Sequence, residues 1–240
     1  MNRQAQLTIW FAVLSVVFFL LLIFLRVPFG LYPLMSVQDA FDILTPLVLI
    51  PIYWLMVTAA ARRSPTLFEQ IAFLVLAGFW VSGHGMHLSA NSINNLTEGL
   101  AREQEIDITG TSIHQLIYFY DEKLSHYLRD IGIIGLAGLV IWRAWRGSDD
   151  EATTWWVAVL SGLLYGFTLF CIFLEGQTVA LGLPFVAIAV SMVLWRGRGK
   201  LAHSQILAFF FVACLAALVL FIGWALYWGG FPQFSEVGLI

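Results

Sequence analysis

Long runs of apolar residues dominate this chain and limit the folds open to it. A transmembrane helix needs about 20 apolar residues, because the hydrocarbon layer is about 30 Å thick and a helix rises about 1.5 Å per residue. Barrel strands are shorter and alternate in polarity, whereas these runs are apolar on all sides. The sequence therefore predicts an all-α polytopic membrane protein, a single seven-helix transmembrane domain over residues 1–240. The predicted helices are residues 8–26, 43–61, 69–92, 113–145, 153–174, 178–195 and 204–228.

The composition excludes several other classes of protein. Hydrophobic residues make up 60% of the chain and charged residues only 11%, against about 25% charged residues in a soluble domain. The net charge of -3 leaves no basic face, so nucleic acid is not an expected partner. Cys171 and Cys214 both lie inside apolar runs, which excludes a disulfide framework.

The distribution of basic residues predicts how the bundle is oriented. Eight of the twelve lie at the N-terminus or after the second, fourth and sixth segments, which all fall on one side of a bundle that crosses the membrane seven times. Because Lys and Arg favour the cytoplasmic side, we expect the N-terminus inside and the C-terminus outside. The first segment is too long for a signal peptide and no cleavage site follows it, so a bacterial inner (cytoplasmic) membrane is the expected location. The eight residues are Arg3, Arg62, Arg63, Arg143, Arg146, Arg196, Arg198 and Lys200.

Polar and ionisable residues interrupt three of the apolar segments. Such residues are energetically unfavourable inside a membrane and indicate a functional site by default. At about 100° per residue, His84, His87, Asn91 and Asn94 share one face of the third helix. On the fourth helix Glu122 and His126 lie on the flank of a second polar face, and Glu175 ends the fifth. The residues of that second face are His114, Tyr118, Asp121, Ser125 and Arg129.

The depth of these residues points to one layer. Counting about 20 residues from the basic side of each helix places His84 and His87, Glu122 and His126, and Glu175 near the opposite surface. The three counts are independent of one another. We therefore expect the polar side chains to meet in the outer leaflet, on the extracytoplasmic side.

Histidine and carboxylate side chains in one layer are typical of a metal site. Imidazole and carboxylate bind zinc, iron and manganese, and histidines three apart on a helix share one face. We expect His84, His87 and His126 to be ligands of zinc, or of iron or manganese. Asp121 or Glu122 is the expected fourth ligand or general base.

Further residues complete the predicted site. Glu175 and His114 are additional candidate metal ligands, and Ser125 is a candidate catalytic residue. Tyr118, Asn91 and Arg129 are candidates for substrate binding. Structural alternatives stay open, since His114 could be interfacial, and Arg129 could form a buried pair with Asp130. Others are the interfacial or capping candidates Glu69, Asp39 and Asp42, and the close-packing ridge Gly132, Gly135 and Gly138.

The pattern of His84, His87, Asp121, Ser125 and His126 resembles the CREST superfamily, which includes the alkaline ceramidases and the adiponectin/progestin-receptor proteins. That resemblance implies a seven-helix fold, a zinc ion held by three histidines with Asp and Ser nearby, and hydrolysis or sensing of lipids. The chain departs from the superfamily in one respect. The superfamily supplies a histidine pair from its last helix, whereas here only His203 precedes that helix.

These observations predict a metal-dependent membrane enzyme that hydrolyses a lipid or another amphiphile. Two irons at the same residues would instead support oxidation, as in a di-iron-type oxidoreductase. A transporter or proton relay and a subunit of a larger complex are the non-enzymatic alternatives. Membrane lipid and a lipid-like substrate are the expected partners, and association into homo- or hetero-oligomers stays open.

Overall fold

The computed structural model describes residues 1–21, 25, 27–30, 36–147 and 152–239. Throughout these residues the regular structure is helical, and six helices are long and apolar enough to cross a membrane. The chain is therefore an all-α integral membrane protein. The elements are α1 (Arg3–Phe19), α2 (Val37–Asp42), α3 (Leu44–Ala59), α4 (Leu67–Glu103), α5 (Ser112–Tyr118), η2 (Phe119–Leu124), α6 (Ser125–Arg146), α7 (Trp155–Glu175), α8 (Val179–Met192), η3 (Val193–Gly197), η4 (Arg198–His203) and α9 (Gln205–Trp228).

Besides the third predicted segment, which is described below, three segments differ from the helices observed. The first, predicted over 8–26, begins at Arg3 and ends at Phe19, so α1 is apolar but shorter than the six spanning helices. Asn2 fixes the start by accepting a hydrogen bond from the N–H of Ala5. The fourth, predicted over 113–145, is divided by the π-helical stretch η2 between α5 and α6. The sixth ends its α-helical part at Met192 and continues as η3 and η4 to α9.

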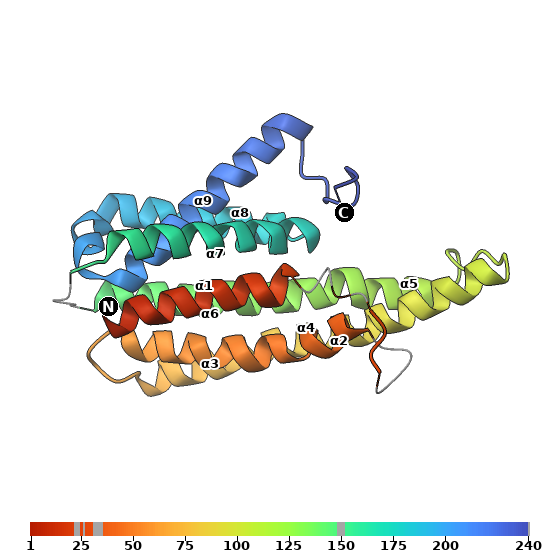
Figure 1. The fold of residues 1–240 in the computed structure, drawn as a ribbon, viewed down its shortest axis with the longest axis horizontal. Coiled ribbons are helices and arrows are strands. Elements are labelled where there is room, and N and C mark those ends of the chain that lie inside the picture. The colour runs from red at the N-terminus through yellow and green to blue at the C-terminus, as the bar shows by residue number, and fades with distance from the viewer. Residues whose placement is uncertain (22–24, 26, 31–35, 148–151, 240) are drawn as a thin grey trace.

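Most of the helices run side by side along the long axis of the molecule, and α9 runs obliquely to them (Figure 1). α1 packs against α3 and α7, α4 packs against α6, and α7 packs against α9. The centre is aromatic, and the rings of Phe11 and Tyr53 meet edge to face at 4.6 Å. In this core the hydroxyl groups of Tyr53 and Tyr165 share a hydrogen bond of 2.6 Å, which satisfies both buried phenols.

α4 and α5 form a helical hairpin that projects beyond the rest of the bundle (Figure 1). α4 has 37 residues, a length of about 55 Å, which exceeds the thickness of a bilayer core. The predicted end of the third helix at residue 92 is therefore wrong, because α4 continues to Glu103 and only residues 104–111 are non-helical. In this loop the hydroxyl and N–H of Thr109 donate to Asp107, and these hydrogen bonds lower the pKa of the Asp107 carboxyl.

Glycines let α4 and α6 pack in close contact. A Cβ atom at Gly83 would lie 2.3 Å from the backbone nitrogen of Arg129, and one at Gly132 would lie 2.6 Å from that of Trp80. Gly135 faces Leu76 in the same way, whereas Gly138 faces open space. The expected close-packing ridge therefore holds at two of its three glycines, and Gly83 extends it next to His84.

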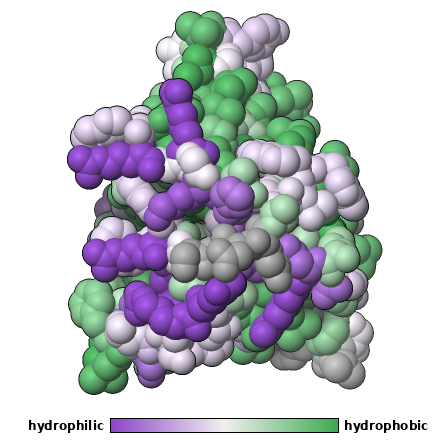
Figure 2. All heavy atoms as spheres, turned by 90° about the vertical axis from the view of Figure 1, so that its left-hand side faces the viewer, coloured by the Kyte–Doolittle hydropathy of each residue, from purple (hydrophilic) through white to green (hydrophobic). Residues whose placement is uncertain are grey.

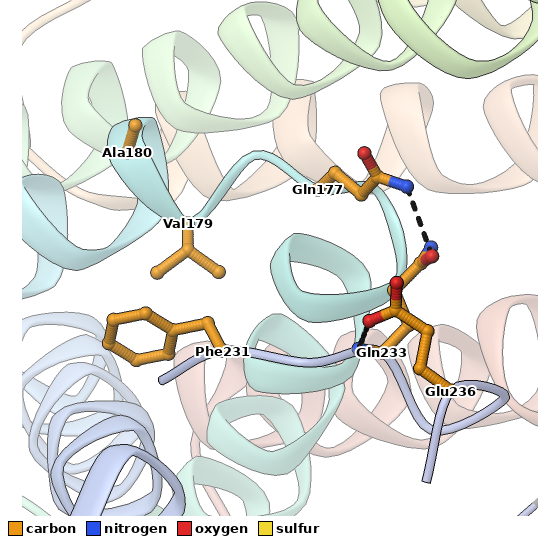
Figure 3. Close-up of a pocket in the computed structure, with 6 residues that line it drawn as sticks. All are labelled: Gln177, Val179, Ala180, Phe231, Gln233 and Glu236. Carbon is orange, nitrogen blue, oxygen red and sulfur yellow. Dashed lines mark hydrogen bonds between the residues drawn. The ribbon is translucent and has the colours of Figure 1, made fainter. Parts of the chain in front are cut away.

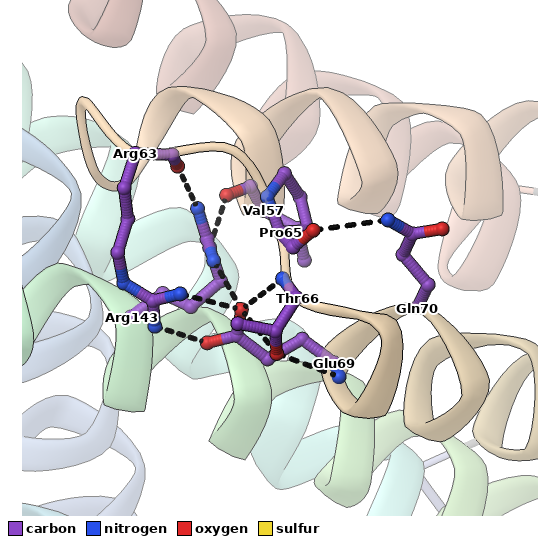
Figure 4. Close-up of polar contacts among 7 residues, drawn as sticks. All are labelled: Val57, Arg63, Pro65, Thr66, Glu69, Gln70 and Arg143. Atoms are coloured by element: carbon purple, nitrogen blue, oxygen red, sulfur yellow. Dashed lines mark hydrogen bonds and ion pairs between the residues drawn. The ribbon is translucent and has the colours of Figure 1, made fainter.

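Hydrophilic side chains gather at one end of the bundle (Figure 2). We call it the basic end, defined by Arg62, Arg63, Arg143, Arg146, Arg196, Arg198 and Lys200. Here the fully buried Arg143 donates to the carbonyl of Val57 at 2.7 Å, to Glu69 Oε2 at 2.6 Å and to the carbonyl of Arg63 at 2.7 Å (Figure 4). Glu69 also accepts from Thr66 and from the Arg63 guanidinium. This network ties α3, the turn after it, α4 and α6 together.

Candidate functional site

Three elements bring imidazole and carboxylate groups together at the other end of the α4–α6 pair. His84 and His87 come from α4, Asp121 from η2 and His126 from α6, and we call these four residues the histidine cluster. His87 Nδ1 lies 2.8 Å from Asp121 Oδ1. The rings of His87 and His126 have centroids 4.7 Å apart. Three of the predicted site residues, one from each element, therefore lie in direct contact.

The π-helical stretch explains how Asp121 and His126 both reach α4. In a π-helix residues five apart stack on one another, and here the N–H of Ser125 bonds to the carbonyl of Tyr120. An uninterrupted α-helix would place His126 on the flank of the Asp121 face, as the sequence predicted. Ser125 donates its hydroxyl to the carbonyl of Asp121. The candidate catalytic hydroxyl of Ser125 is thus used to hold the backbone of this stretch.

Asp42, at the end of α2, is a partner of His84 that the sequence analysis treated as interfacial or capping. His84 Nε2 lies 2.8 Å from the carbonyl oxygen of Asp42 and 3.3 Å from its Oδ1. His84 is 3% exposed and Asp42 is half-buried, so this contact is largely shielded from solvent. Asp39, in contrast, does cap α2 by accepting from the N–H of Ser36. In the sequence, the signal for this contact was an acidic residue, Asp42, next to an apolar segment. Only the folded chain shows that it contacts His84.

The corner between α7 and α8 closes the other side of the histidine cluster. His126 Nδ1 lies 3.2 Å from the carbonyl oxygen of Gly176. Lys123 donates to the side chain of Gln177. Arg129 forms the buried ion pair with Asp130 that was its structural alternative, since its Nε lies 2.8 Å from Asp130 Oδ1. Thr178, which the sequence analysis did not single out, donates to Asp130 Oδ2 at 2.5 Å.

Several atoms of the histidine cluster are buried without a hydrogen-bond partner. They are His84 Nδ1, His87 Nδ1 and both carboxylate oxygens of Asp121. The His87–Asp121 contact is short, but its angles do not form a hydrogen bond. An unsatisfied buried polar group costs about 1–3 kcal/mol. The cluster therefore holds a polar surface that the protein itself does not satisfy.

Negative charge predominates around these groups. Asp121 and Glu122 are neighbours on η2, and Asp42 lies within electrostatic reach of both His84 and His87. The cations in reach are Lys123 and Arg129, and the charge of Arg129 is matched by Asp130. Among the described residues, the three carboxylates of Asp42, Asp121 and Glu122 thus face one cation, Lys123, that has no carboxylate of its own. The site is electrostatically suited to an additional positive charge.

Other predicted site residues lie apart from the histidine cluster. His114 is on the projecting hairpin, roughly 18 Å along the helix from His126, and its Nε2 lies 3.6 Å from Glu98 Oε1. The Glu175 carboxylate accepts from the N–H of Phe234 at 2.5 Å. Asn91 accepts from Asn95 at 2.9 Å, and Tyr118 is 41% exposed. The contacts of His114, Glu175 and Asn91 are therefore with partners outside the cluster.

No closed metal-ligand set is present in the part of the chain that the structure describes. Among those residues no group of three or more His, Cys, Asp or Glu side chains is placed so that it could hold a metal ion. The donors of the cluster are of the correct chemical type, but His87 and Asp121 contact each other directly. Comparison with known proteins adds no constraint, because no family model, curated protein or solved structure matches this chain.

Proposed function

We propose that this protein is a metal-dependent membrane hydrolase that acts on a lipid or another amphiphile at the histidine cluster. The observation that carries the proposal is the set of buried nitrogen and oxygen atoms on His84, His87 and Asp121 that make no hydrogen bond. One divalent cation would satisfy these atoms and neutralise the excess of carboxylates around them.

The hydrogen bonds already made by the histidines support this proposal. Metal-binding histidines commonly donate their second ring nitrogen to a carbonyl or carboxylate, which fixes the ring. His126 uses Nδ1 for the carbonyl of Gly176 and keeps Nε2. His84 uses Nε2 for Asp42 and keeps Nδ1. We expect these two nitrogens, His87 and Asp121 to hold the ion once the His87–Asp121 contact opens to admit it.

The ligand types favour zinc, with iron or manganese as alternatives. Three imidazoles and a carboxylate suit zinc, whereas two histidines and one carboxylate are also a common iron(II) arrangement. When bound, such an ion supplies Lewis-acid activation of water and of a substrate carbonyl or phosphoryl group. Glu122 is half-buried beside Asp121, where its carboxylate would take up the proton released by water.

The location of the cluster suits an amphiphilic substrate. His84 lies 17 residues after the start of α4 and His126 lies 20 residues before the end of α6. These spacings place both about 25–30 Å from the basic end, which is about the thickness of the hydrocarbon layer. With the basic end in the cytoplasm, the cluster would lie on the extracytoplasmic side of a bacterial inner membrane, at headgroup depth.

A proton relay across the membrane has less support. Between the histidine cluster and the basic end the core is apolar, with Leu49, Met56 and Phe73 among its buried residues. The hydroxyl pair of Tyr53 and Tyr165 is enclosed in that core. A relay would need polar groups or water along the whole path.

Metal analysis of the purified protein tests the proposal. We expect about one zinc per chain in the wild type, lost in His84→Ala/His87→Ala, in His126→Ala and in Asp121→Asn. His114→Ala and His203→Ala are matched controls, since both histidines lie outside the cluster, and they should retain the metal. Two irons would redirect the proposal to oxidation. Protein that binds neither zinc, iron nor manganese would overturn it, as would metal that persists in the cluster variants.

A further inference from the structure

The residues after α9 form a second polar site beside the histidine cluster. Residues 229–239, which we call the C-terminal segment, turn back toward the end of α7 (Figure 1). Gln233 donates to the carbonyl of Glu175 at 2.6 Å, and the N–H of Phe234 donates to the Glu175 carboxylate. The Phe234 ring packs edge to face on Trp224 of α9, with centroids 5.1 Å apart. The C-terminal segment is therefore held in place by both polar and aromatic contacts.

A cavity of about 260 Å³ lies between this segment and the α7–α8 corner. One of its walls is apolar, formed by Val179, Ala180 and Phe231, and the other is polar (Figure 3). The polar wall consists of Gln177, Gln233 and Glu236. A site with one apolar and one polar wall suits a molecule that has both kinds of surface, and the volume fits a headgroup rather than a whole lipid.

Gln177 connects this cavity to the histidine cluster. It follows Gly176, whose carbonyl contacts His126, and its side chain bridges Lys123 and Gln233. Gln177 has a φ of 52°, a conformation that glycine adopts far more readily than other residues. This conformation is the left-handed cap that ends α7, in which the N–H of Gln177 donates to the carbonyl of Leu174 and the N–H of Thr178 to the carbonyl of Phe173. Here it keeps the side chain of Gln177 at the junction of the two sites.

The polar wall carries hydrogen-bond acceptors, and carboxylate groups predominate around it. Gln177 donates to Gln233, and Gln233 donates to the carbonyl of Glu175. Glu236 accepts one hydrogen bond from the N–H of Gln233, through Oε2, which leaves Oε1 for a ligand. Glu175 lies within electrostatic reach of Glu236. Together with the aromatic face of Phe231, these carboxylates favour a cation, because an ammonium group is attracted to both.

We propose that this cavity binds the ammonium headgroup of an amphiphile and so presents the adjoining bonds of that molecule to the histidine cluster. The part of this inference that concerns catalysis, presentation of the substrate to the histidine cluster, rests on the proposed function. Binding of the headgroup itself depends only on the cavity and does not require a metal.

Lipid binding to the detergent-solubilised protein, measured by native mass spectrometry, tests this proposal. The probes are lysophosphatidylethanolamine and lysophosphatidylglycerol with the same acyl chain, which share the phosphate and differ in the ammonium group. We expect the wild type to bind the ammonium lipid about tenfold more tightly. Glu236→Gln should remove most of this preference, and Phe231→Leu should reduce it. Equal affinity for both probes in the wild type, or an unchanged preference in Glu236→Gln, would overturn the proposal.

A pair of glycine substitutions separates the role of Gln177 from its backbone strain. Gln177→Gly and Glu105→Gly each relieve a positive φ, since Glu105 has a φ of 54° in the loop after α4. Only Gln177→Gly should weaken binding of the ammonium lipid, while both should fold. An equal effect of the two variants would contradict the role of the Gln177 side chain. Metal content measured in parallel distinguishes failure of this proposal from failure of the metal site, because the Glu236→Gln chain should keep its metal.

Discussion

The two ends of the α4–α6 pair both bury charged groups, but they treat them differently. At the basic end Arg143 donates to two carbonyls and to Glu69, and Glu69 accepts from three residues. At the other end Asp121 is 1% exposed and neither of its oxygens has a hydrogen-bond partner. A buried polar network whose hydrogen bonds are all made stabilises a unique packing, whereas one with unsatisfied atoms requires a further partner for those atoms. The contrast marks the first as a structural network and supports the proposal that the second is a functional site.

The largest loss of stability is expected when the Arg143–Glu69 network at the basic end is disrupted. Arg143→Ala removes one of the two guanidinium partners of the buried Glu69 carboxylate, leaving Arg63, and leaves two carbonyls without a donor. Removing one partner of a buried ion pair typically costs about 3–5 kcal/mol. We expect a loss of that size in the free energy of unfolding, measured by denaturant titration in mixed micelles. Arg146→Ala is the matched control, because Arg146 is exposed and stacks only on Trp142, and it should change stability by less than about 1 kcal/mol.

Much of the fold could be predicted from hydropathy, because apolar length is a local property. The fifth helix was predicted over 153–174 and α7 covers Trp155–Glu175. Hydropathy finds where a helix crosses the lipid but not where it ends. α4 therefore continues past the predicted end at 92, through a stretch that retains good helix formers such as Leu96, Glu98 and Leu100.

The candidate site was predictable in its depth but not in its pairings. Counting residues along α4 and the helix of His126 correctly placed His87 and His126 in one layer, where their rings meet. The π-helical stretch at Asp121 was not predictable, because it depends on how α4 and α6 pack. The contact of Asp42 with His84 spans 42 residues, and only the folded chain specifies it. The depth count also included Glu175, which faces the C-terminal segment instead.

An intermediate loss in the free energy of unfolding is expected where α4 and α6 are in close contact between the two ends. At Gly83 a Cβ would lie 2.3 Å from the backbone nitrogen of Arg129 and 2.5 Å from the carbonyl oxygen of Ser125, so Gly83→Ala must push α4 and α6 apart. Overpacking of this kind costs about 1–3 kcal/mol. We expect that loss in the same unfolding measurement, with weaker metal binding because His84 and His126 move apart. Gly85→Ala has open space around its Cβ and should be neutral or stabilising, so an equal loss there would argue against the close contact.

The smallest effect on stability is expected at the histidine cluster itself, where the effect on function should be largest. Asp121→Asn neutralises a buried carboxylate that accepts no hydrogen bond and keeps a side chain of the same size beside His87, so relief of its desolvation should offset the lost attraction to His87 and the free energy of unfolding should change by less than about 1 kcal/mol. Metal affinity should fall by more than the roughly 10- to 100-fold caused by changes outside the ligand shell. Glu69→Gln makes the same chemical change at the basic end and should do the reverse, with a clear loss of stability and unchanged metal binding per folded chain. If both variants destabilised the protein equally and metal binding survived in Asp121→Asn, the two ends would not differ in kind, and the histidine cluster would be a second structural network.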